Sequence, residues 1–222
     1  MSHSRSSAHG LRSNRINSLR RSACSVLGGL ALLFACSTHH AEAKEPKQVV
    51  EHFQDALLDT MKRAQELGID GRYNQLRPEL EKAFDLPRMI RVASGTAWGE
   101  AGDGKQRALV DAFARMSTST YASQFRGYSG ESFVIDGVRD GPRDTQLVAT
   151  QIVKAGGDKV PITYVLVAGK DGDWRIGDIL LDNSVSELAV RRSEYSAILR
   201  KDGVDALIKT LNDKADGLMA AK

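Results

Sequence analysis

Histidine and cysteine are scarce in this chain. His52 is the one histidine of five that lies after residue 43, and both cysteines, Cys24 and Cys36, lie before it. A zinc site needs several Cys or His ligands, and a nucleophilic triad needs an imidazole beside its nucleophile. Residues 44–222 therefore lack the side chains that a zinc site, a disulfide or a reactive thiolate needs. His52 has polar neighbours on a predicted helix, so we interpret it as an exposed helical residue.

An excess of positive charge is also missing once the first 43 residues are set apart. Those residues hold five of the 31 basic side chains and one of the 28 acidic ones, which leaves 26 basic and 27 acidic side chains in residues 44–222. The net charge of that part is about −1, so nothing in it predicts a nucleic-acid partner. It also lacks a Gly-rich phosphate-binding motif.

Long apolar runs are absent except for "ACSVLGGLALLFAC" at residues 23–36, which follows five arginines and precedes "AEA" at 41–43. This order is typical of a cleavable signal peptide, and the run is short for a transmembrane helix. We expect residues 1–43 to be a signal peptide and residues 44–222 to be one exported, periplasmic domain. The alternatives are an uncleaved anchor and a lipidated Cys36.

Residues 44–222 show helical patterns at both ends and strand patterns between them. Apolar residues at helical spacing predict helices over 46–67, 76–83, 84–95, 105–125, 186–199 and 204–218. Four strands are expected at 133–138, 146–154, 160–168 and 174–181, with hairpin turns at "AGGD" and "GKDGD". This order predicts an α+β fold with helices packed on a curved antiparallel sheet of about four strands.

The strands carry apolar side chains on both faces. In "VPITYVLV", Ile162, Tyr164 and Leu166 face one way, while Val165 and Val167 face the other. Such a strand must be covered on both faces, or covered on one face and lining an apolar cavity with the other. We favour the face with Tyr164 for the cavity, because its hydroxyl suits the mouth and its ring suits an apolar interior.

Four blocks resemble one family over nearly all of residues 49–218. They are "GRYNQLRPELEKAFDLPRMIRVASGTAW", "QRALVDAFARMSTSTYASQFRGYSGESF", "VPITYVLV" and "GDWRIGDILLDNSVSELAVRRSEYSAIL". They resemble the MlaC family of periplasmic phospholipid carriers, also known as toluene-tolerance auxiliary proteins, and are closest to its hopanoid-associated subgroup. The resemblance implies an NTF2-like fold with an apolar cavity, and a bound phospholipid or hopanoid-type lipid with its head group at the mouth. It implies shuttling between an outer-membrane lipoprotein–porin complex and an inner-membrane MCE-domain/ABC transporter complex.

The candidate site residues follow from the strand faces, the helical stripes and this resemblance. The residues expected to line the cavity are Phe84, Met89, Trp98, Phe113, Met116, Tyr121, Phe133, Ile162, Tyr164, Leu166 and Ile176. An ordinary packed core is the alternative for each of them. The residues expected at the rim or on a docking surface are Arg191, Arg192, Glu194 and Tyr195, for which a solvated helix face with weak ion pairs is the alternative.

The function expected is lipid carriage without catalysis, cofactor or metal. An NTF2-like isomerase or dehydratase acting on an apolar substrate in the same pocket is the competing hypothesis. That enzyme would need an acid/base pair deep in the pocket, and no histidine of residues 44–222 is predicted there. A protein with a solid core that serves in assembly is a third possibility.

Overall fold

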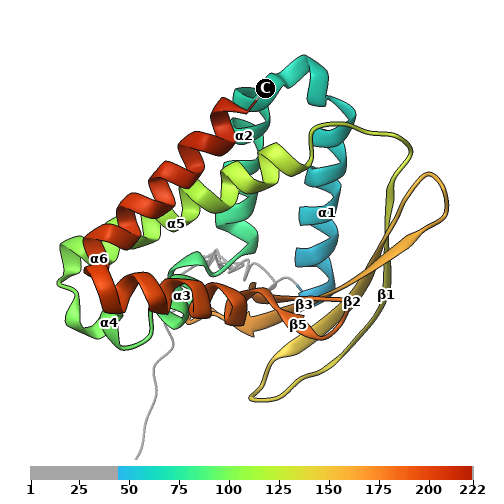
Figure 1. The fold of residues 1–222 in the computed structure, drawn as a ribbon. Coiled ribbons are helices and arrows are strands. Elements are labelled where there is room, and N and C mark those ends of the chain that lie inside the picture. The colour runs from blue at the N-terminus through green and yellow to red at the C-terminus, as the bar shows by residue number, and fades with distance from the viewer. Residues whose placement is uncertain (1–44, 222) are drawn as a thin grey trace, which may run out of the picture. The chain divides into compact units, whose positions relative to one another are not determined.

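The computed structural model describes residues 45–221, which form an α+β fold with helices packed on an antiparallel sheet (Figure 1). The fold class predicted from the sequence is therefore confirmed, and the expected signal peptide at residues 1–43 lies outside the described residues. The elements in chain order are α1 (Pro46–Lys62), α2 (Ala64–Ala83), α3 (Leu86–Ser94), α4 (Thr96–Glu100), α5 (Asp103–Gln124), β1 (Ser132–Asp140), β2 (Gln146–Val153), β3 (Lys159–Ala168), β4 (Trp174–Leu181), β5 (Val185–Ser186) and α6 (Glu187–Ala220).

The sheet is a meander whose strands lie in chain order, each antiparallel to the next. Tyr164 on β3 is paired with Val148 on β2 and with Ile179 on β4. Directly opposed residues share a face of the sheet, and these three side chains lie on the face that the helices cover. The sequence predicts the four long strands, and the two-residue β5 extends the sheet beyond them.

The helices lie on one side of the sheet and also pack on one another. Figure 1 shows α5 and the C-terminal half of α6 running side by side, and α1 standing against the strands. The corner between α2 and α3 is fixed to β4, because the backbone N–H of Asp85 donates to the carbonyl of Ile176 at 2.9 Å. Asp85 also caps α3 by accepting a hydrogen bond from Arg88 N.

The long helix α6 begins at a double cap and is broken once. Ser186 accepts a hydrogen bond from Ala189 N through its hydroxyl, and Asp178 on β4 accepts one from Leu188 N at 3.0 Å. These bonds satisfy N–H groups that have no partner inside the helix. Gly203, with φ of 77°, interrupts the helical backbone. Its left-handed conformation explains why the sequence pattern predicts two helices here.

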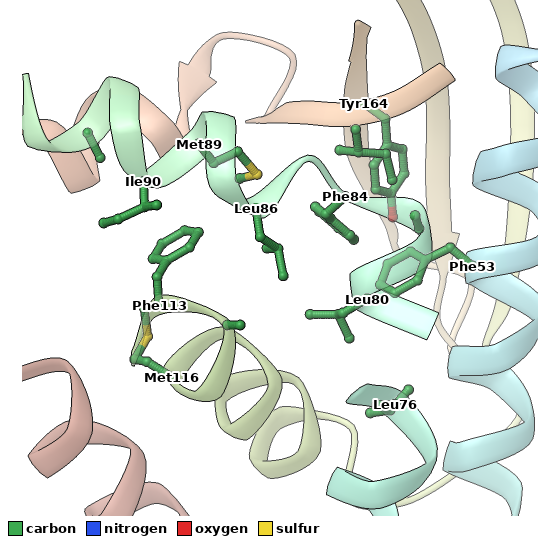
Figure 2. Close-up of a cluster of buried hydrophobic side chains, with 14 of the residues drawn as sticks. Phe53, Leu76, Leu80, Phe84, Leu86, Met89, Ile90, Phe113, Met116 and Tyr164 are labelled. Carbon is green, nitrogen blue, oxygen red and sulfur yellow. The ribbon is translucent and has the colours of Figure 1, made fainter. Parts of the chain in front are cut away.

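The core fills the space between the helices and the sheet. Phe53 on α1 contacts Phe84 edge to face with ring centroids 4.9 Å apart, and contacts Tyr121 in the same way at 5.4 Å. Figure 2 shows Leu80, Leu86 and Phe113 directed from three different helices toward one common space. That space is the starting point for the functional site.

Candidate functional site: an apolar cavity with a polar mouth

A cavity of about 280 Å³ lies between the helices and the sheet. Its lining comes from α1, α2, α3, α5 and α6, from all four long strands, and from the segments that flank α2 and α5. The lining residues are Leu57, Leu80, Phe84, Leu86, Met89, Phe113, Ser117, Thr120, Tyr121, Gln124, Phe125, Phe133, Ile152, Ile162, Tyr164, Ile179, Leu181, Glu187, Leu188 and Arg191.

One end of the cavity is closed and apolar. Leu80, Met89 and Phe113 line this end and are buried. The aromatic rings of Phe84 and Tyr121 form part of the wall, with centroids 6.1 Å apart. The side chains of Leu80, Met89 and Phe113 offer dispersion contacts and no hydrogen-bonding groups, so this end suits a hydrocarbon.

The other end is open, and we call it the mouth. Gln124 and Leu181 line the cavity and are exposed, and Phe125 beside them is half-buried. The aromatic ring of Phe125 stacks on that of Tyr121 with centroids 5.7 Å apart. The lining residues therefore change from buried at the closed end to exposed at the mouth.

Polar side chains of the lining come from two helices. Ser117, Thr120 and Gln124 lie on α5 at helical spacing, and Glu187 and Arg191 lie one turn apart on α6. Thr120 Oγ1 donates to the carbonyl of Met116 at 2.9 Å, so its hydroxyl hydrogen is already used inside α5. Glu187 and Arg191 are the charged members of the described lining.

Two tyrosines of the lining have hydroxyls that stay neutral far above neutral pH. Burial raises the pKa of Tyr164 to about 12, against a smaller opposing effect of the Gln54 side chain. Burial also raises the pKa of Tyr121 well above its usual range. A general base needs a pKa close to the working pH. Neither phenol therefore has a pKa suited to a general base near neutral pH.

Seven of the residues expected to line the cavity lie in its wall. They are Phe84, Met89, Phe113, Tyr121, Phe133, Ile162 and Tyr164. The first four lie on α3 and α5 or between α2 and α3, and Phe133 lies at the start of β1. Ile162 and Tyr164 lie on the β3 face that the sequence favours. Their role in lipid binding stays a prediction.

Four other expected residues lie outside the lining. Met116, Leu166 and Ile176 are fully buried in the core, where other side chains pack against them. Trp98 lies on the short helix α4 and lines a separate shallow groove with Pro87 and Val110. The helical and strand periods place Met116, Leu166 and Ile176 on an inward face, but they do not give the depth at which the cavity ends.

The four residues expected at the rim separate into three environments. Arg191 lines the cavity with its side chain 21% exposed. Arg192 and Glu194 are exposed on the outer face of α6. Tyr195 is buried in the core rather than placed on the rim, because it shares the inward face of α6 with Leu188 and Arg191. Its position i+4 from Arg191 and i+7 from Leu188 is the signal that could have identified this burial.

Most of the lining residues that sequence reasoning missed are polar or aliphatic, and one, Phe125, is aromatic. They are Leu57, Leu80, Leu86, Ser117, Thr120, Gln124, Phe125, Ile152, Ile179, Leu181, Glu187 and Leu188. Among residues 45–221, no group of three His, Cys, Asp or Glu side chains is placed to hold a metal ion. In the same residues, no helix has the length and apolar character needed to cross a membrane.

Fold and site together define an α+β protein whose helices and antiparallel sheet enclose an apolar cavity with a polar mouth. Residues 51–213 match the family model described as MlaC protein, and the chain belongs to the MlaC family. A search of curated proteins found no match.

A solved structure with a similar fold is a phospholipid-binding protein from Ralstonia solanacearum, determined in complex with a phospholipid. The TM-score is 0.69 at 18% sequence identity, and the match covers 79% of this chain and 99% of that one. At this identity the likeness shows the shared fold. Membership of the MlaC family points to a binding or transport protein rather than an enzyme.

Proposed function

We propose that this protein is a periplasmic carrier that holds a phospholipid with its acyl chains in the cavity and its head group at the mouth. The observation that carries the proposal is the cavity itself, whose lining is mainly apolar and also includes the polar side chains of Gln124, Glu187 and Arg191. Membership of the MlaC family and the phospholipid complex of the Ralstonia protein support the choice of ligand. A hopanoid-type lipid, also an apolar body with a polar end, is the second candidate.

A carrier must release its ligand as well as bind it, and the apolar cavity meets that need. Each methylene buried from water contributes about 0.8 kcal/mol. Two acyl chains with roughly 30 methylenes would contribute on the order of 24 kcal/mol, above the practical ceiling of about 18–21 kcal/mol for noncovalent binding. A lipid that moves from a bilayer leaves an environment that is already apolar, so exchange between the two is close to neutral.

We further propose that residues 1–43 are removed on export and that residues 44–222 are the working carrier of an Mla-type ABC transport system. Its partners would be an outer-membrane lipoprotein–porin complex and an inner-membrane MCE-domain/ABC transporter complex. Export agrees with the arginine-rich start, the 14-residue apolar run and "AEA" in the sequence. The family, whose members are periplasmic, supports this location.

A transfer assay tests carriage directly. Donor vesicles with a fluorescent phospholipid and acceptor vesicles without it are mixed with the purified protein, and the transferred fluorescence is followed with time. We expect transfer to rise with protein concentration. A rate that equals the rate without protein, for both a phospholipid and a hopanoid, would contradict the proposal.

A further inference from the structure

We propose that Glu187 and Arg191 form a head-group site that selects zwitterionic phospholipids, with the phosphate on Arg191 and the head-group ammonium on Glu187. This inference rests on the proposed function, because it assigns the polar end of the same ligand. It names the head-group chemistry that the mouth accepts, which neither the family nor the fold determines.

The first observation is that Arg191 has unused hydrogen-bonding capacity. Its guanidinium lies 3.7 Å from a carboxylate oxygen of Glu187 and 3.9 Å from one of Glu194. Both distances exceed the length of a normal hydrogen bond. A guanidinium presents five N–H donors in a planar fork that matches a phosphate in a bidentate manner. Arg191 is therefore a donor group at the cavity wall that its neighbours do not saturate.

The second observation is the position of this guanidinium. Its side chain is 21% exposed, whereas those of Glu187 and Glu194 are 34% and 52% exposed. Arg191 is thus the most sheltered charge of the three, and partial burial strengthens its interaction with an anion relative to open solvent. A phosphate bound here would remain next to the apolar wall formed by Leu188 and Tyr121, which is where a glycerol backbone would connect it to acyl chains.

The third observation is the charge balance of the mouth. Glu187 and Arg191 carry the charges of the described lining, one negative and one positive. A phosphate on Arg191 weakens the attraction that Arg191 exerts on Glu187. A cationic head group restores a partner for that carboxylate, whereas a head group with only a negative charge leaves it without one. A like charge or an unpaired charge at a partly buried site is unfavourable. The site therefore fits a head group with one phosphate and one ammonium.

The test compares three lipids with identical acyl chains: phosphatidylethanolamine, phosphatidylglycerol and diacylglycerol. Protein stripped of lipid is loaded from equimolar mixtures, and the bound lipids are quantified by mass spectrometry. In the wild type we expect phosphatidylethanolamine to exceed phosphatidylglycerol about tenfold, as one charge-assisted contact would give, and to exceed diacylglycerol, which offers neither charge, by more than that.

Two variants and two matched controls on the same helix separate the roles. Arg191→Gln should lower the preference for phosphatidylethanolamine over diacylglycerol about tenfold, because it removes the phosphate contact, while diacylglycerol binding stays unchanged. Glu187→Gln should bring phosphatidylethanolamine close to phosphatidylglycerol. Arg192→Gln alters an exposed arginine outside the lining, and Glu194→Gln removes the other carboxylate near Arg191, so both should keep the wild-type preferences.

Different results would contradict the head-group site and the proposed lipid carriage on which it rests. Equal binding of the three lipids by the wild type would overturn the head-group site and leave lipid carriage standing. An equal loss of all three lipids in Arg191→Gln would also overturn it, because Arg191 would then only support the cavity. Binding of no lipid at all, diacylglycerol included, would refute the proposed function itself.

Discussion

Arg72 Nε donates a hydrogen bond of 2.8 Å to the backbone carbonyl of Ala122, fifty residues further along the chain. A second guanidinium nitrogen donates to the carbonyl of Ala64 at 2.9 Å. Arg72 is 8% exposed, and burial lowers the pKa of its guanidinium, with a smaller effect from nearby Arg126. One buried side chain therefore ties the start of α2 to the last turn of α5, next to Tyr121 in the cavity wall.

Replacing this guanidinium should destabilise the protein. Arg72→Met leaves two buried carbonyls without their donors, and we expect the free energy of unfolding to fall by about 2–3 kcal/mol. Arg77→Met on the same helix is the matched control, because Arg77 is more exposed and pairs with Glu81 on the surface. That control should change stability by less than about 1 kcal/mol. Urea unfolding of both variants makes the comparison, and equal losses would contradict a special role for Arg72.

A bulky residue in the cavity wall should displace lipid without unfolding the protein. Ile162 lines the cavity from β3, so Ile162→Trp places its added volume in open space. Val165, on the opposite face of the same strand, is the control position. We expect Ile162→Trp to lower the co-purified lipid several-fold with little change in stability, and Val165→Trp to leave the lipid content as it was. Leu166→Trp is unsuitable as a test, because Leu166 is fully buried outside the lining and overpacking there costs about 1–3 kcal/mol.

Alkaline pH should destabilise the fold through its buried tyrosines. Tyr164 has a pKa of about 12 in the folded protein and about 10 when unfolded. Its folded pKa is the higher one, so the folded state retains the proton longer, and stability is lost as the pH rises from about 10 to about 12. The loss from this residue is on the order of 2–3 kcal/mol.

Tyr164→Phe should therefore reduce the drop in unfolding free energy between about pH 9 and pH 11.5. Some dependence should remain, because burial also raises the pKa of Tyr195 to about 12. Tyr128→Phe alters an exposed phenol and should keep the wild-type profile. A wild-type profile that is flat over this range would show that Tyr164 does not ionise on unfolding.

Docking to membrane partners should depend on the exposed charge of α6. Arg192→Glu reverses an exposed charge on α6 without altering the lining, and we expect binding to either proposed membrane complex to weaken about 3- to 10-fold at low salt. The difference should shrink as salt rises, since salt screens exposed charges. Lys214→Glu makes the same reversal on an exposed residue near the other end of α6. Surface plasmon resonance measures the affinity of both variants. An equal loss of affinity in the two would show that this end of α6 is not a specific docking surface.

The long strands could be predicted closely from the sequence, whereas α2 runs over Ala64–Ala83 and only its residues 76–83 were predicted as a separate helix. The predicted strand at residues 174–181 coincides with β4, and that at 146–154 exceeds β2 by one residue. The short elements could not be found in this way. β5 has two residues and α4 has five, so neither completes enough of a repeat to produce a pattern.

The site could be predicted only in part, for a different reason. Alternation along β3 places Tyr164 and Leu166 on one face, but the cavity reaches Tyr164 and stops before Leu166. The depth at which the cavity ends depends on which helix side chains fill the space, and this cannot be predicted from the sequence of one strand. Gln124 was missed because a polar residue at the end of a helix is ordinarily solvated, and only the fold brings it to the mouth.

Native mass spectrometry of the purified protein, before and after extraction with organic solvent, shows whether the protein carries lipid. We expect a species heavier than the chain by the mass of one or more lipids, a return to the mass of the chain after extraction, and a phospholipid or hopanoid in the extract. A single species at the mass of the chain, with no lipid in the extract and none taken up from vesicles, would contradict it.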